Sequence, residues 1–114
     1  MGMYISIGKN TGWGLTSGLF DIITESTREL FSAEQYGCMK SIYEAFDDQG
    51  QSFIVLDSVD RDCFNLFYRH CKAAMEAFPD SPRGKISPLK SISGILWNWS
   101  EILRLMREDS RYRG

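Results

Sequence analysis

The longest regular pattern of apolar residues in the chain lies between Ile86 and Asp109. Apolar residues recur there at steps of three and four, which places them on one stripe of an α-helix. The stripe comprises Leu89, Ile92, Ile95, Leu96, Trp99, Ile102, Leu103 and Met106. Ser87 can cap such a helix, and Pro88 suits its first position because no N–H is needed there. We therefore expect a helix from about Pro88 to Asp109, against which the rest of the chain packs.

Three further stretches upstream show the same helical period. The expected helices span residues 18–31, 32–49 and 57–78. Ser32 and Gln35 have the spacing of a capping box at the start of the second helix, and Gly50 ends it. Asp57 or Ser58 can cap the third helix. Its inward stripe is predicted to be Cys63, Phe64, Phe67, Cys71, Ala74, Met75 and Phe78.

Two short runs have the character of β-strands. Residues 3–7 alternate between apolar and polar side chains, and residues 52–56 are rich in β-branched and aromatic side chains between two turn signals. We expect these runs to pair. Residues 79–85 form a linker that is too short to separate domains. The predicted fold is a single α+β domain over residues 1–114, mostly helical, with about four helices around a long C-terminal helix and a small two-stranded β element.

The glycine-rich segment from Gly8 to Gly18 invites comparison with a phosphate-binding loop. The Walker pattern needs four residues between its first glycine and a Gly-Lys-Ser/Thr sequence, whereas Lys9 here follows Gly8 directly. The comparison therefore fails. We expect a flexible loop with Trp13 folded back onto the core, and keep a small-ligand site in this loop as an alternative.

Charge is divided unevenly along the chain, although the formal net charge is only −2. Residues 1–62 hold ten acidic and four basic side chains, a net charge of −6, whereas residues 63–114 hold five acidic and nine basic ones, a net charge of +4. An acidic face of this kind repels nucleic acid and attracts basic partners. The alternative is that both halves are solvated helix surfaces that folding interleaves.

The three cysteines, Cys38, Cys63 and Cys71, have no paired spacing. Cys63 and Cys71 are about 12 Å apart along one predicted helix, so they cannot share a zinc ion or form a disulfide with each other. Cys38 with Cys71 is the one long-range pair we consider. We otherwise expect buried, reduced thiols that serve packing, and give His70 no catalytic or metal-binding role beside them.

Neither the N-terminal residues nor any internal run resembles a secretory signal or a membrane span, which favours a soluble, cytoplasmic protein.

Two acidic groups near the middle of the chain invite a metal-binding interpretation. Residues 45–56 fail the pattern of a calcium loop because Ala45 and Leu56 occupy its first and last ligand positions. Asp57, Asp60 and Asp62 could hold magnesium, but helix capping and the helix dipole account for them without an ion. We therefore predict no metal and no cofactor.

Trp97 falls off the apolar stripe of the last helix, so we expect it to be partly exposed. It is then either an interface anchor or the cover of a second packed surface. Four arginines, at positions 104, 107, 111 and 113, make the C-terminal tail basic. They complement the helix dipole, and no nucleic-acid-binding motif accompanies them, so nucleic acid is not the expected partner.

In size, acidic first half, aromatic content and lack of a catalytic set, the chain resembles the immunity proteins of bacterial contact-dependent growth inhibition systems. The resemblance implies a small cytoplasmic protein, not an enzyme, that binds a cognate toxin. Such a toxin is often a nuclease with a basic active-site cleft, which the immunity protein occludes with acidic and aromatic groups.

From the charge pattern and Trp97 we expect the contact surface to include Asp47, Asp48, Asp57, Asp60, Asp62 and Trp97. The partner is a basic protein domain, not nucleic acid or a membrane, and the chain itself is a monomer or weak dimer. The competing interpretations are a small enzyme or ligand-binding domain that uses the Gly8–Gly18 loop, and a structural subunit.

Overall fold

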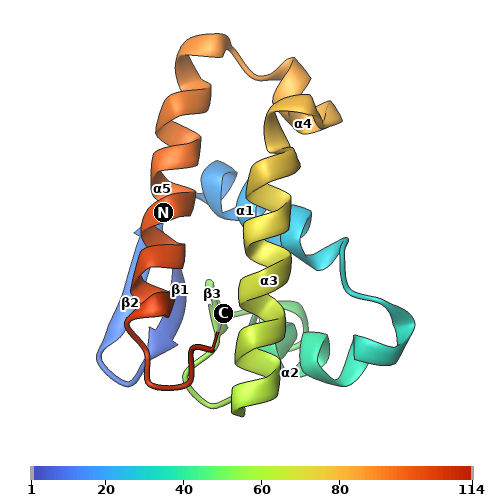
Figure 1. Cartoon of the computed structure of the whole chain (residues 1–114), viewed down its shortest axis with the longest axis vertical. Helices are drawn as coiled ribbons and strands as arrows, with labels where there is room; N and C mark the ends of the chain where they lie inside the picture. The colour runs from blue at the N-terminus through green and yellow to red at the C-terminus, as the bar shows by residue number, and fades with distance from the viewer. Residues whose placement is uncertain (1, 114) are drawn as a thin grey trace.

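The computed structural model describes residues 2–113 and shows an α+β fold that is mostly helical (Figure 1). Met1 and Gly114, which the predicted domain includes, lie outside the described residues. In chain order the elements are β1 (Met3–Gly8), β2 (Thr11–Leu15), α1 (Ser17–Arg28), the 3₁₀ turn η1 (Ala33–Gln35), α2 (Tyr36–Asp47), β3 (Phe53–Val55), α3 (Arg61–Ala77), the 3₁₀ turn η2 (Phe78–Asp80), α4 (Pro82–Ile86) and α5 (Leu89–Arg107).

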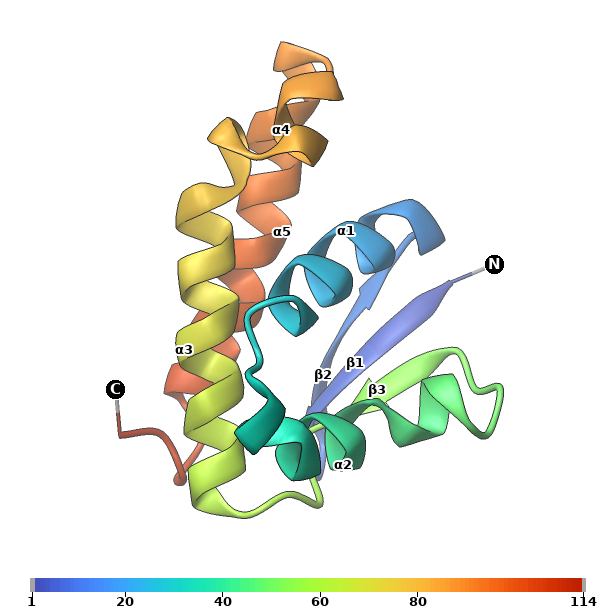
Figure 2. The ribbon, with the colours of Figure 1, turned by 90° about the vertical axis from the view of Figure 1, so that its right-hand side faces the viewer.

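The three strands form one sheet in the order β2-β1-β3. β1 pairs with β3 in parallel, with Ile5 opposite Ile54, so the predicted pairing of these two runs is confirmed. The prediction of a two-stranded element is incomplete, because β2 joins the other edge of β1 as an antiparallel hairpin. Figure 2 shows α2 lying along β3 at the edge of the sheet.

β2 lies inside the segment for which the sequence predicted a flexible loop, so that prediction is wrong for residues 11–15. Gly12 makes room for the Tyr4 ring: a Cβ at this position would clash with the Tyr4 hydroxyl group, so the ring covers the strand where a side chain would stand. Trp13 is partly buried against the edge of the core, as predicted.

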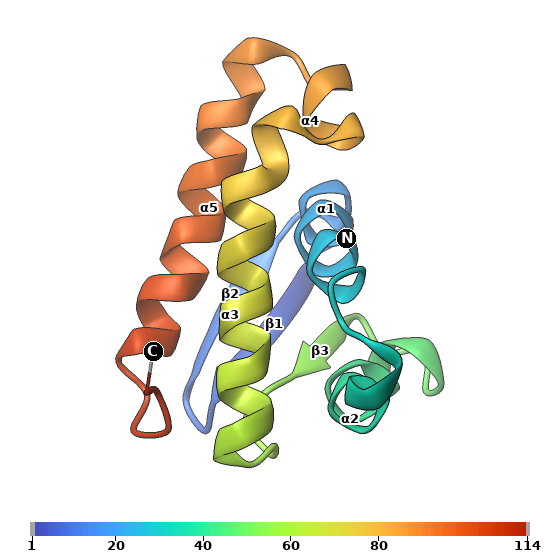
Figure 3. The same cartoon turned by 45° about the vertical axis from the view of Figure 1, so that its right-hand side comes forward.

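One face of the sheet is buried and the other faces solvent. Ile5 and Ile7 are fully buried, whereas Tyr4 is exposed, as expected for alternating side chains of a half-buried strand. Figure 3 shows α3 and α5 passing over the strands as an antiparallel pair. The hydrophobic core therefore lies between this pair, α1, α2 and the buried face of the sheet.

Trp99 joins α5 to α3 at the centre of this core. Its side chain is fully buried, its indole N–H donates to the backbone carbonyl of Cys71 at 3.0 Å, and its ring centroid lies 5.5 Å from that of Phe78. The predicted stripe of α5 is buried from Ile95 to Met106, with Leu96 partly buried. It is wrong at Leu89, which is 87% exposed because the first turns of α5 extend past the other helices.

The start of α3 and the linker before α5 also differ from the predictions. Asp60, not Asp57 or Ser58, caps α3 by accepting a hydrogen bond from the Cys63 backbone N–H at 2.9 Å. The predicted linker contains the short helix α4, which Ser81 caps by accepting from the Gly84 N–H. Several residues at each helix start have side chains that can act as a cap. The spacing of apolar residues does not indicate which of them does so.

A disulfide links Cys38 on α2 to Cys63 in the first turn of α3. The prediction that these two residues are reduced packing thiols is therefore wrong, and so is the pairing of Cys38 with Cys71. Cys71 is buried and free, and burial raises the pKa of its thiol to about 11, which agrees with an inert packing role. The bridge is possible because folding brings the Cα atoms of Cys38 and Cys63 to 5.3 Å of each other.

We predict that Trp99→Ala lowers the free energy of unfolding by about 3–5 kcal/mol, because it leaves a large cavity and removes the hydrogen bond from the indole to the Cys71 carbonyl. Trp97→Ala, at a side chain that is 57% exposed, should cost less than about 1 kcal/mol. Urea titrations of both variants measure the difference. Equal losses at the two positions would contradict this account of the core.

We also predict that replacing Cys38 and Cys63 together by Ser costs about 3 kcal/mol, because the bridge closes a loop of 25 residues in the unfolded chain. The fold itself should persist, since the core does not depend on either sulfur. Urea titration with and without a thiol reductant provides the measurement. Reductant should destabilise the wild type and leave the double variant unchanged; an unfolded reduced protein would show that the core is insufficient alone.

Candidate partner-binding surface

Carboxylates of α2 and of the α3 cap meet around a shallow depression. Its volume is about 420 Å³, and it is lined by Ser41, Glu44, Ser58, Val59, Asp60 and Cys63. Asp48, the C-cap of α2, lies one turn beyond Glu44 and outside this lining. We call Glu44, Asp48 and Asp60 the α2/α3 carboxylates. Asp48 and Asp60 were predicted to be contact residues, whereas Glu44 was not. The spacing of four residues between Glu44 and Asp48 could have indicated that they lie close together on a helix.

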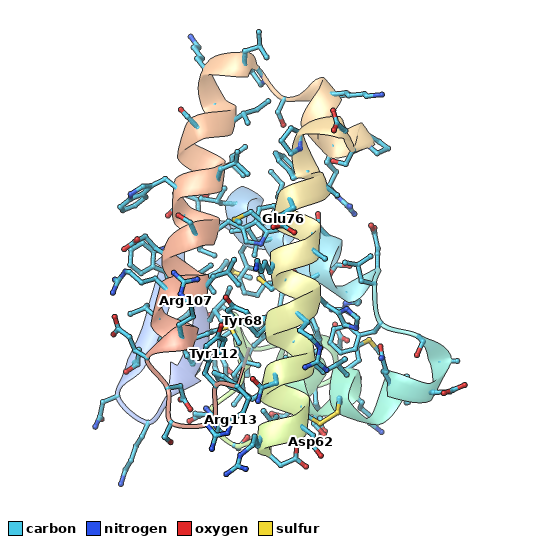
Figure 4. The ribbon with its side chains drawn as sticks, in the orientation of Figure 1. Asp62, Tyr68, Glu76, Arg107, Tyr112 and Arg113 are labelled. Atoms are coloured by element: carbon cyan, nitrogen blue, oxygen red, sulfur yellow. A yellow bond between two sulfur atoms is a disulfide. The ribbon has the colours of Figure 1, made fainter. Side chains whose placement is uncertain are left out.

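The other predicted carboxylates at this end of the molecule are exposed. Asp57 lies in the segment between β3 and α3, and Asp62 lies in the first turn of α3, where a negative charge stabilises the helix. Figure 4 labels Asp62 at the foot of α3. Capping and the helix dipole thus give Asp60 and Asp62 structural roles, while their carboxylates still face solvent.

Asp47 is turned towards α1, away from the α2/α3 carboxylates. Its two carboxylate oxygens accept hydrogen bonds of 2.8 and 3.0 Å from Arg28. The Arg28 guanidinium in turn lies over the Tyr43 ring, 4.0 Å from its centroid, and the Tyr43 hydroxyl donates to the Thr24 carbonyl. Asp47 therefore belongs to a structural network that holds α1 to α2, while the residue itself remains exposed.

Trp97 is 57% exposed on the outer side of α5, as predicted. Its neighbour is the Trp13 ring of β2, with centroids 5.7 Å apart in an edge-to-face arrangement. A depression of about 420 Å³ beside it is lined by Met75, Glu76, Pro79, Leu96, Trp97 and Ser100. Trp13 and Glu76 were not predicted to lie beside Trp97. Strand β2 brings Trp13 to it, and the pairing of α3 with α5 brings Glu76.

The arginines of the C-terminal segment are engaged within the protein. Arg104 forms ion pairs with Glu101 and Glu108. The Arg111 side chain donates to the carbonyls of Ile7, Leu56 and Val59, and it forms an ion pair with Asp109 that holds the pKa of that carboxyl below its usual value. These contacts fasten the C-terminal segment to the sheet and to the start of α3.

His70 and a larger depression lie outside the two regions described above. His70 Nε2 lies 2.9 Å from the Gln35 side-chain oxygen, and partial burial together with Arg69 lowers its pKa. Within residues 2–113 no three His, Cys, Asp or Glu side chains are grouped so that they could hold a metal ion. A depression of about 660 Å³ between α1, α3 and α4 has Leu30 and Phe78 in its lining, and the Arg83–Glu29 ion pair lies at its edge.

None of the helices in the described part of the chain is long and apolar enough to cross a membrane.

Comparison with known proteins gives one informative match. No protein-family model and no curated protein matches the sequence. The fold is similar to that of a chain in the solved structure of a CdiA-CT toxin from Burkholderia pseudomallei E479 in complex with its cognate CdiI immunity protein. The TM-score is 0.82, with 18% identity over 96% of this chain and 97% of that chain. At this identity the match shows the fold, and it confirms at that level the resemblance to contact-dependent growth inhibition immunity proteins.

Proposed function

We propose that this chain is an immunity protein that binds a cognate bacterial toxin domain and neutralises it, without catalysing a reaction of its own. The observation that carries the proposal is the similarity, over nearly the whole length of both chains, to a chain from a solved toxin–immunity complex. The charge pattern and the absence of a recognisable catalytic motif in the sequence independently favoured the same class of protein. We place its action in the cytoplasm, as a monomer or weak dimer. Because the cytoplasm is reducing, we propose that the core keeps the protein folded there when the Cys38–Cys63 bridge is reduced.

Occlusion of a basic active-site cleft is the mechanism we propose. A nuclease must bind the phosphates of its substrate with lysine and arginine side chains, so its cleft attracts carboxylates. Glu44 and Asp60 line one depression, Asp48 is one turn from Glu44, and Asp57 and Asp62 are exposed on either side of Asp60, so these carboxylates offer such a cleft a negatively charged surface. Charge complementarity of this kind raises the association rate and disfavours wrong partners.

If the proposal is correct, the reading frame next to the gene for this chain should encode a protein with a toxin domain, and the test uses that domain. Isothermal titration of the purified domain with this protein should give a 1:1 complex with a Kd in roughly the nanomolar range expected for a specific protein interface. The matched control is a toxin domain from an unrelated system, which should give no heat of binding. Absence of binding to the adjacent domain, with both proteins folded, would refute the proposal.

A second prediction concerns the α2/α3 carboxylates. Glu44→Lys combined with Asp48→Lys should slow association by about tenfold or more at low salt and reduce its dependence on ionic strength, because charges at an interface edge act mainly on the encounter. Stopped-flow association at two salt concentrations measures both effects. Asp21→Lys, at an exposed carboxylate of α1 outside both this depression and the one beside Trp97, is the control and should leave the rate unchanged. An unchanged rate in the folded double variant would remove these residues from the interface.

A further inference from the structure

The depression beside Trp97 combines an apolar floor with one carboxylate. Met75 and Glu76 come from α3, Pro79 from η2, and Leu96, Trp97 and Ser100 from α5. Figure 4 labels Glu76 on the second half of α3, on the side that faces α5. The lining is therefore supplied by two rigid helices that the buried Trp99 holds together.

The Trp97 ring is held in place before any partner arrives. The edge-to-face contact with Trp13 fixes one side of it, and the Trp13 indole N–H donates to the Asn98 side-chain oxygen at 3.1 Å. Asn98 is itself fixed by donating to the Gly94 carbonyl. An exposed aromatic ring with this support loses little conformational freedom on binding, which is a property of energetically important interface residues.

Glu76 is exposed, and it forms no ion pair with any side chain in residues 2–113. Glu29 and Glu101, by contrast, are paired with arginines of this chain. A carboxylate without an internal partner, beside an apolar floor and an exposed indole, matches the three parts of an arginine side chain. The stem is apolar, the planar guanidinium stacks on aromatic rings, and its N–H groups pair with carboxylates.

We propose that this depression receives an arginine side chain of the toxin domain. The stem lies against Leu96 and Met75, and the guanidinium contacts both the exposed part of the Trp97 ring and the Glu76 carboxylate. The inference rests on the proposed function for the identity of the partner. It adds a second contact, on the α3–α5 side of the molecule, to the one made by the α2/α3 carboxylates.

The test is a double-mutant cycle with the adjacent toxin domain, measured by isothermal titration. Trp97→Leu keeps an apolar side chain and removes the aromatic ring, and should weaken binding about tenfold. Glu76→Gln keeps the shape and removes the charge, and should weaken binding about threefold. Because one guanidinium contacts both residues, the double variant should be weakened by clearly less than the roughly thirtyfold product.

Two controls separate this contact from a general effect. Leu89→Ala changes an exposed apolar side chain of the same helix outside the depression and should leave the Kd within about twofold. Trp97→Phe keeps an aromatic ring and should bind better than Trp97→Leu. Thermal unfolding of each variant confirms that the fold is intact.

The failure of this inference is distinguishable from the failure of the proposed function. If the wild type binds the toxin domain but Trp97→Leu and Glu76→Gln each bind within twofold of it, the arginine site is refuted and the proposed function stands. Single effects that multiply in full would show independent contacts and would also refute a shared guanidinium. If the wild type does not bind at all, both the proposed function and the inference that rests on it are refuted.

Discussion

The hydrogen bond between the Trp99 indole and the Cys71 carbonyl fixes how α5 lies on α3, and the exposed surface of α5 follows from it. Successive residues of a helix are about 100° apart, so Trp97 lies about 200° around the axis from Trp99. Burying Trp99 between the helices therefore turns Trp97 outwards, where Trp13 of β2 supports it. One buried interaction thus sets both the packing of the core and the orientation of the aromatic residue that we place in the interface.

Much of the fold was predictable because it depends on local periodicity. The helical period predicted the buried stripe from Ile95 to Met106. The strand character of two short runs predicted the pairing of β1 with β3. β2 was not predictable in this way, because the two glycines of its sequence TGWGL are typical of turns and obscure the alternation of Trp13 and Leu15. The Cys38–Cys63 bridge joins two helices whose mutual orientation the sequence pattern leaves open.

The residues of the candidate surface could also be predicted only in part, because sequence patterns do not give the orientation of one helix against another. Asp47 and Asp48 are neighbours in the sequence, but a step of about 100° turns one towards Arg28 and the other towards the face of Glu44. The net charge of the segment could not show that Asp47 pairs with Arg28 and Asp48 does not, because this difference depends on the rotation of α2 against α1. Glu76 was equally hidden, since the role that we propose for it depends on the lack of an ion pair and on a tryptophan from another helix. Exposure of Trp97, by contrast, followed directly from its position off the stripe.

The central claim is that this chain protects a cell from a toxin, and survival measures that claim most directly. Cells that express the adjacent toxin domain from an inducible promoter should stop growing, and co-expression of this chain should restore growth. Co-expression of an unrelated immunity protein should not restore it. Continued growth arrest in cells that contain this protein in folded, soluble form, in molar excess over the toxin domain, would contradict the account.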